Sequence, residues 1–183
     1  MINCFVSYEY VLNFGSKETL KEIADIPKPN PGAPIPWILS NDSDLYLSFY
    51  TSEKTFESYQ NISSNNLKVT NYEKDCVVTV VFKSFCKYMV GLPNDEVLSS
   101  HALYNKGLDS LYNAEVINSS WIVELEKMNS VHPSHNREWF LKDLKHFIIT
   151  FKNNIFECVA KGYDVSLSLG SPYQSIREII NTD

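Results

Sequence analysis

Alternation of apolar and polar residues predicts β-strands along much of the chain. Between Asn3 and Leu12 the apolar side chains share one parity, which is typical of a strand buried on one face. Segments 37–40 and 45–50 flank the polar residues Asn41–Asp44, so we expect them to form a hairpin. The segment Cys76–Val90 is apolar on both parities and rich in β-branched residues, which indicates one long central strand buried on both faces for part of its length.

A further hairpin is expected near the C-terminus. The apolar runs 146–151 and 155–167 flank the dipeptide Asn153-Asn154, which favours a two-residue type I′ turn. Such a turn places Phe151 directly opposite Phe156 and fixes the pairing of every other residue in the two strands.

Helical spacing is confined to short segments, most of them after residue 95. The expected helix caps are Ser16, the cluster Asn118-Ser119-Ser120, Asn136, and Ser171 with Pro172 and Gln174 in a capping box. The apolar neighbours of Trp37, Trp121 and Trp139 predict that these rings lie in the core. Strands joined mostly by hairpins, with few helices, predict an α+β fold. We expect mainly antiparallel β-sheet with a few helices packed on one face, in a single domain covering residues 1–183.

The composition limits which partners and which cellular compartment we expect for the protein. The chain has 183 residues, a net charge of -6 and no basic run, so we expect no nucleic-acid partner. No stretch approaches the roughly 20 apolar residues that span a bilayer, and the N-terminus lacks a basic leader region, so neither a membrane nor export is expected. The four cysteines, none in C-x-x-C spacing, predict buried free thiols in the reducing cytoplasm; they are Cys4, Cys76, Cys86 and Cys158.

Several segments resemble a widespread family of small bacterial proteins. They are PGAPIPWILSND, VGLPNDE, NSSWIVELEKMNSVHP and KHFIITFKNNIFECVAKGYDV, which together span roughly Pro31 to Asp164. In that family a His-Asp pair often stands where this chain has Lys152-Asn153, so any role of that pair is absent here. The resemblance implies a bacterial, cytoplasmic, single-domain protein and transfers no activity and no catalytic residue.

The strongest candidate for site chemistry is the pair His132 and His135. Two imidazoles three residues apart can share a metal ion if His101 or Glu115 supplies a third ligand. However, Pro133 removes the pair from a regular helix, and no established metal signature is present. The alternative is that both rings cap backbone groups at a helix–loop–helix junction, and this interpretation is favoured.

The predicted hairpin register argues against two further candidate sites, one at His146 and Glu157 and the other at Cys158. In that register Thr150 faces Glu157, so His146 lies four residues out of step with Glu157, about 13 Å at ~3.4 Å per residue. An acid–base dyad of His146 and Glu157 is therefore rejected. Cys158 falls on the apolar face, where a thiol reacts poorly.

These observations favour a non-enzymatic binding protein over an enzyme. The sequence lacks the G-x-S-x-G, G-x-G-x-x-G and Walker motifs, and no cofactor is expected. An acidic surface and a set of tyrosines near predicted loops and strand edges suggest a protein partner, as for an immunity or regulatory subunit. The alternative is a small hydrolase or metal-dependent enzyme that uses His101, His132 and His135, with Glu115 as a further candidate. The oligomeric state stays open.

Overall fold

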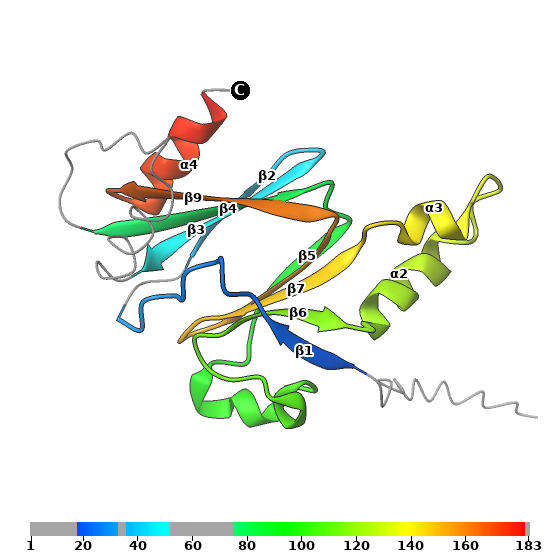
Figure 1. Ribbon diagram of the computed structural model, residues 1–183, viewed down its shortest axis with the longest axis horizontal. Coiled ribbons are helices and arrows are strands. Elements are labelled where there is room, and N and C mark those ends of the chain that lie inside the picture. Colours follow the sequence, from blue (N-terminus) through cyan, green and yellow to red (C-terminus); the bar gives the residue numbers. More distant parts are fainter. Residues whose placement is uncertain (1–17, 33–35, 52–74, 182–183) are drawn as a thin grey trace, which may run out of the picture.

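The chain forms two antiparallel β-sheets, with helices packed against both (Figure 1). The structure is a computed structural model and describes residues 18–32, 36–51 and 75–181. The first sheet contains β1 (Thr19–Glu22), β6 (Asn113–Ile117), β7 (Lys145–Thr150), β8 (Ile155–Ala160) and β5 (Lys87–Gly91), in that order. The second contains β2 (Trp37–Ser40), β3 (Asp44–Thr51), β4 (Cys76–Lys83) and β9 (Gly162–Leu169). The predicted α+β class with mainly antiparallel sheet is confirmed.

The chain crosses between the sheets where β4 leads into β5 and again where β8 leads into β9. β4 pairs with β9 in the second sheet, and the continuations β5 and β8 pair in the first. At the bend the Lys161 N–H donates to the Lys83 carbonyl at 3.0 Å, and Ser84 has a positive φ of 50°. The prediction of one straight strand over Cys76–Val90 was therefore wrong, because the chain changes sheets within it.

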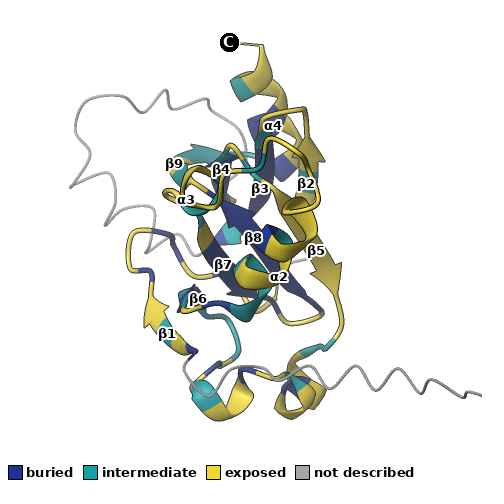
Figure 2. Cartoon of the chain, turned by 90° about the vertical axis from the view of Figure 1, so that its right-hand side faces the viewer, coloured by how far each residue is buried: buried dark blue, intermediate teal, exposed yellow. Residues whose placement is uncertain are grey.

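The main core lies between the sheets. Most of its large fully buried side chains come from β3, β4, β7 and β8, strands whose residues are largely coloured as buried in Figure 2. They include Leu47, Phe49, Phe82, Phe147 and Phe156, and the Phe82 and Phe156 rings stack with centroids 5.4 Å apart. A buried phenylalanine contributes about 1.5–3 kcal/mol by leaving water, so this aromatic contact holds the two sheets together.

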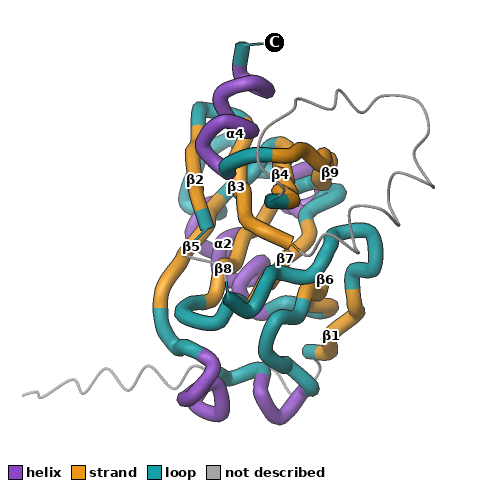
Figure 3. The backbone as a smooth tube through the Cα atoms, turned by 90° about the vertical axis from the view of Figure 1, so that its left-hand side faces the viewer, coloured by secondary structure: helices purple, strands orange, loops and turns teal. Residues whose placement is uncertain are grey.

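The helices are divided between the two outer faces rather than gathered on one (Figure 3). On the first sheet lie the 3₁₀ helices η1 (Asp95–Ser100) and η2 (Tyr104–Lys106), together with α2 (Ser120–Asn129) and, after it, α3 (Arg137–Leu141). On the second sheet lies α4 (Pro172–Ile180), whose Ile176 packs with Tyr46 and Val81. The two packing sites correspond to the two separate outer faces that a pair of stacked sheets exposes.

Most predicted caps and turns are confirmed. Ser119, Asn136 and Ser171 cap α2, α3 and α4, and Ser171 forms the full capping box with Gln174. In the hairpin of β2 and β3, the Asn41 side chain accepts the backbone N–H of Asp44 at 2.7 Å.

Three local predictions were wrong and one falls outside the described residues. The segment expected as a helix after Ser16 contains strand β1 instead, since its residues pair with β6. Trp139 and Trp37 are 80% and 51% exposed, so neither ring lies in the core. The strand expected over Asn3–Leu12 lies among the residues that the structure does not describe.

None of the helices in the described part of the chain is both long and apolar enough to cross a membrane.

Candidate functional site

A chain of polar side chains, buried except for the partly exposed His101, lies on the outer face of the first sheet. It consists of Ser119, His146, Glu157 and His101, which we call the Glu157 cluster. The Nε2 atom of His146 lies 2.8 Å from Oε2 of Glu157, and its Nδ1 atom lies 2.8 Å from Oγ of Ser119. On the other side, Nε2 of His101 lies 3.5 Å from Oε1 of Glu157. One carboxylate therefore contacts two imidazole rings.

The contact between His146 and Glu157 corrects the register expected from the sequence. The turn spans four residues, so Thr150 pairs with Ile155 and Ile148 pairs with Glu157. The Phe151 N–H closes this turn by donating to the Asn154 carbonyl at 2.9 Å. The strands are thus shifted by two residues from the prediction, which keeps every side chain on its expected face. His146 and Glu157 become diagonal neighbours within reach of each other, so rejecting the dyad was wrong.

Each member of the cluster is placed by a different element. His146 and Glu157 project from the central strands β7 and β8, whereas His101 is the residue that ends η1. Ser119 is the cap of α2, and its Oγ accepts the N–H of Ile122 at 3.3 Å. The cluster therefore joins two helical segments to the sheet between them.

The hydrogen bonds determine where the protons lie. The Leu103 N–H donates to Nδ1 of His101 at 3.2 Å, which leaves the ring proton on Nε2, facing Glu157. The Ser119 hydroxyl accepts from Ile122 and can donate its own proton to Nδ1 of His146, so the proton of His146 also faces Glu157. Both rings therefore direct an Nε2 proton at the carboxylate of Glu157.

The electrostatics support an ionised Glu157. Burial by itself raises the pKa of this carboxyl group, but hydrogen bonds from His101 and His146, and the charge these rings can carry, lower it to about 2. A buried carboxylate is tolerated when it accepts several hydrogen bonds. Glu157 therefore keeps its negative charge throughout the physiological pH range.

The order serine, histidine, carboxylate also occurs in acyl-transfer enzymes, where a histidine takes the serine proton. Here Ser119 and His146 are each 4% exposed and Glu157 is 5% exposed. The ring of Trp121 packs edge-on to His146 with centroids 5.0 Å apart, and the Lys87 ammonium lies 5.8 Å from the Trp121 ring. The Ser119 hydroxyl is therefore covered, and its hydrogen bonds within the protein are already made.

The histidines singled out in the sequence do not converge. His135 donates from Nε2 to Glu126 at 2.9 Å and accepts from Asn129 at Nδ1, which ties the loop before α3 to α2, and its ring lies against Phe140 of α3. The exposed His132 accepts the Ser134 N–H within the same loop at 3.2 Å. His101 belongs to the Glu157 cluster instead.

Glu115, the further candidate, lies on β6 opposite Phe147. Neighbouring residues point to opposite faces of a strand, so the Glu115 side chain lies on the other side of the sheet from Val116 and His146. Across residues 18–32, 36–51 and 75–181, no group of three or more His, Cys, Asp or Glu side chains is placed to hold a metal ion.

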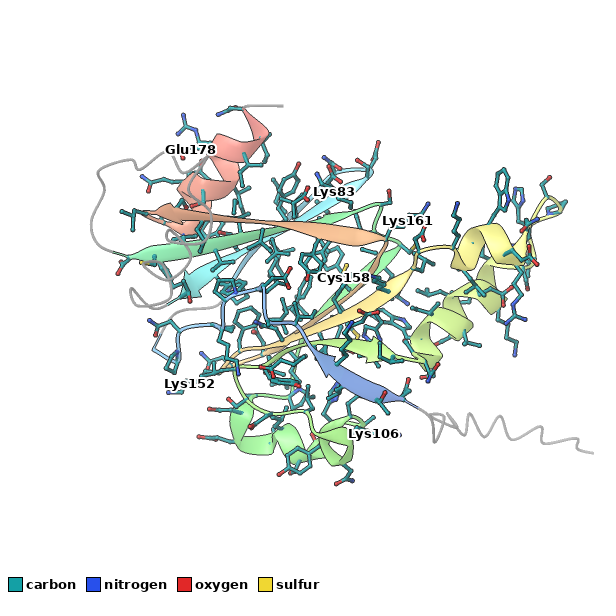
Figure 4. The ribbon with its side chains drawn as sticks, viewed as in Figure 1. Lys83, Lys106, Lys152, Cys158, Lys161 and Glu178 are labelled. Carbon is teal, nitrogen blue, oxygen red and sulfur yellow. The ribbon has the colours of Figure 1, made fainter. Side chains whose placement is uncertain are left out.

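Cys158 lies between the sheets, fully buried among apolar side chains, as the sequence predicted (Figure 4). Burial raises the pKa of its thiol, so the reactive thiolate is disfavoured. Cys76 is also buried, whereas Cys86 is exposed at the bend between β4 and β5, contrary to the expectation that it is buried.

Sequence reasoning missed Ser119, His146 and Glu157 as a group. The signal that could have found them was the shared parity of His146 and Glu157 across the hairpin, because two residues on one face stay on that face when the register shifts by two residues, and such a shift can bring them into contact.

Comparisons with protein-family models, with curated proteins and with solved structures found no match, so the resemblance to a bacterial family remains a prediction.

Proposed function

We propose that the protein is a non-enzymatic binding protein of a bacterial cell that engages a protein partner, as an immunity or regulatory subunit would. The observation that carries the proposal is a set of exposed apolar side chains on α2, on α3 and on the loop that joins them, which we call the apolar tip. Its members are Met128, Val131 and Trp139, which are 59%, 86% and 80% exposed. The tip stands out at one end of the molecule (Figure 1).

The composition of this tip is typical of a binding surface. Tryptophan and methionine are enriched in protein interfaces, and tryptophan is prominent among residues whose truncation costs the most affinity. The two helices of the tip are held together by His135, which bonds to Glu126 and Asn129 of α2 and packs its ring against Phe140 of α3. A fixed apolar surface loses little conformational entropy when a partner covers it. The net charge of -6 favours a basic partner surface around this contact.

Affinity purification from the native host tests the proposal. Truncation of a central tryptophan costs about 2 kcal/mol or more, or roughly 30-fold in affinity. Trp139→Ala should therefore lose the partner that the wild-type protein retains. Trp37→Ala is the matched control, because Trp37 is also exposed but lies on β2, where it contacts Tyr173. Failure to recover any specific protein, or equal recovery by Trp139→Ala, contradicts the proposal.

The Glu157 cluster favours a second candidate function, a small hydrolase in which His101 takes part. In this hypothesis Nδ1 of His146 takes the proton of Ser119 as the Oγ atom attacks an ester carbonyl, and it passes that proton to the alcohol that leaves when the ester C–O bond breaks. It ranks second because Ser119 and His146 are covered. The metal-dependent form has less support, since the ring proton of His101 occupies the nitrogen that faces Glu157. A fluorophosphonate probe that labels the wild-type chain but not Ser119→Ala supports the hydrolase, and absence of labelling contradicts it.

A further inference from the structure

The strand β5 forms one edge of the first sheet and is exposed along its whole length. Within the described residues β8 is its single strand neighbour, and all five of its residues are exposed. Tyr88, Met89 and Val90 are 37%, 50% and 44% exposed, and the following Leu92 is 84% exposed. An edge strand presents unpaired N–H and C=O groups to solvent and is a template for another strand.

Natural edges are usually protected by charges, prolines or a covering element. β5 carries a single charged residue, Lys87, at its first position, and Pro93 follows only after its last. The edge strand β2 of the second sheet lies on the same side of the molecule and exposes Trp37 and Leu39 (Figures 2 and 3). This side of the molecule therefore presents two strand edges and an apolar surface.

The sequence of β5 is compatible with a second copy of itself. In an antiparallel pair centred on Met89, Tyr88 faces Val90 of the second copy, and Lys87 faces Gly91. This register pairs all five residues, and the two lysines lie at opposite ends of the contact. An aromatic residue opposite a β-branched one is a favourable cross-strand pair, and like charges directly opposite each other are avoided.

We infer that β5 pairs antiparallel with β5 of a second copy across a two-fold axis at Met89, joining the two first sheets into one continuous sheet. The same patch then serves both subunits, as a closed two-fold dimer requires. A contact of five residues per strand is smaller than a standard interface, even with flanking contacts from β2. We therefore expect the dimer to have a dissociation constant of about 1–100 μM.

Sedimentation velocity of the full-length chain over this concentration range tests the inference. The wild-type protein should pass from monomer to dimer. Met89→Lys and Met89→Glu each place two like charges at the axis and should weaken the dimer at least about tenfold. An equimolar mixture of the two variants should restore association, because lysine then faces glutamate. Val97→Lys is the control, since Val97 is 50% exposed on η1 rather than on β5, and it should leave the dimer unchanged.

A second variant keeps the test decisive if a charge at Met89 impairs folding. Met89→Cys in a Cys86→Ser background should form an intermolecular disulfide on mild oxidation, whereas Val97→Cys in that background should not. A wild-type protein that stays monomeric at all concentrations overturns the inference. So does a dimer that is insensitive to both charge variants, or failure of the mixture to associate. The partner-binding surface is separate, so Trp139→Ala should leave the dimer intact, and the two proposals can fail independently.

Discussion

Replacing Glu157 by glutamine should remove the ionised centre of the buried cluster while keeping its shape. The carboxyl pKa falls from 4.5 to about 2 in the folded protein. At ~1.36 kcal/mol per tenfold change in the acid dissociation constant, this lower pKa corresponds to about 3 kcal/mol in favour of the ionised form. Glutamine also directs an amide N–H₂ at rings that already donate, which leaves one donor without an acceptor. We expect Glu157→Gln to lower the free energy of unfolding by about 3 kcal/mol at pH 7.

The pH dependence follows from the direction of the shift. A depressed folded pKa gives stability that is present above the unfolded value of 4.5 and is lost as the pH falls toward 2. The difference in free energy of unfolding between the wild-type protein and Glu157→Gln should therefore shrink as the pH falls from 4.5 to 2, and the two proteins should be similarly stable near pH 2. Urea unfolding followed by tryptophan fluorescence, at pH steps from 7 to 2, measures both quantities.

Glu115→Gln is the matched control, since Glu115 lies on the neighbouring strand β6 with its side chain on the opposite side of the sheet. It should change the free energy of unfolding by less than about 0.5 kcal/mol. A loss below about 1 kcal/mol for Glu157→Gln at pH 7, or a loss of equal size at pH 7 and pH 3, refutes the interpretation of the cluster.

Two further predictions concern the thiols and the last helix. In a Cys4→Ser background, a thiol reagent should modify the exposed Cys86 in the native protein. It should modify the buried Cys76 and Cys158 only after unfolding. Rapid modification of all three thiols in the native protein contradicts the packing between the sheets. Ser171→Ala removes the capping box of α4 and should cost about 1 kcal/mol in urea unfolding, whereas an unchanged midpoint rules out the cap.

Local signals in the sequence identified much of the fold. Caps such as Ser119 and Ser171 were predictable because their hydrogen bonds involve residues three positions away. The hairpin of β2 and β3 was predictable for the same reason, since Asn41 closes its own turn. Short-range hydrogen bonds leave a signature in the residue types at fixed spacing.

The long-range arrangement was not predictable in the same way. The bend after Lys83 depends on the first sheet, to which the chain crosses from the second, and the residues of the bend carry no glycine or proline to indicate it. The turn after Thr150 has two possible lengths with the same parity, and packing chooses the longer one. His101 reaches Glu157 from a segment more than fifty residues away. Tertiary packing therefore decided the candidate site, and local propensity did not.

The central claim is that the Glu157 cluster is covered, with His146 hydrogen-bonded to both Ser119 and Glu157 inside the protein. Nitrogen-15 NMR of the histidine side chains at pH 7 tests it most directly. The claim predicts that His146 and His101 are protonated at Nε2, and that the Nε2 proton of His146 exchanges slowly enough with water to be observed. A proton on Nδ1 of His146, or exchange too fast for its Nε2 proton to be seen, contradicts the claim and favours an accessible site.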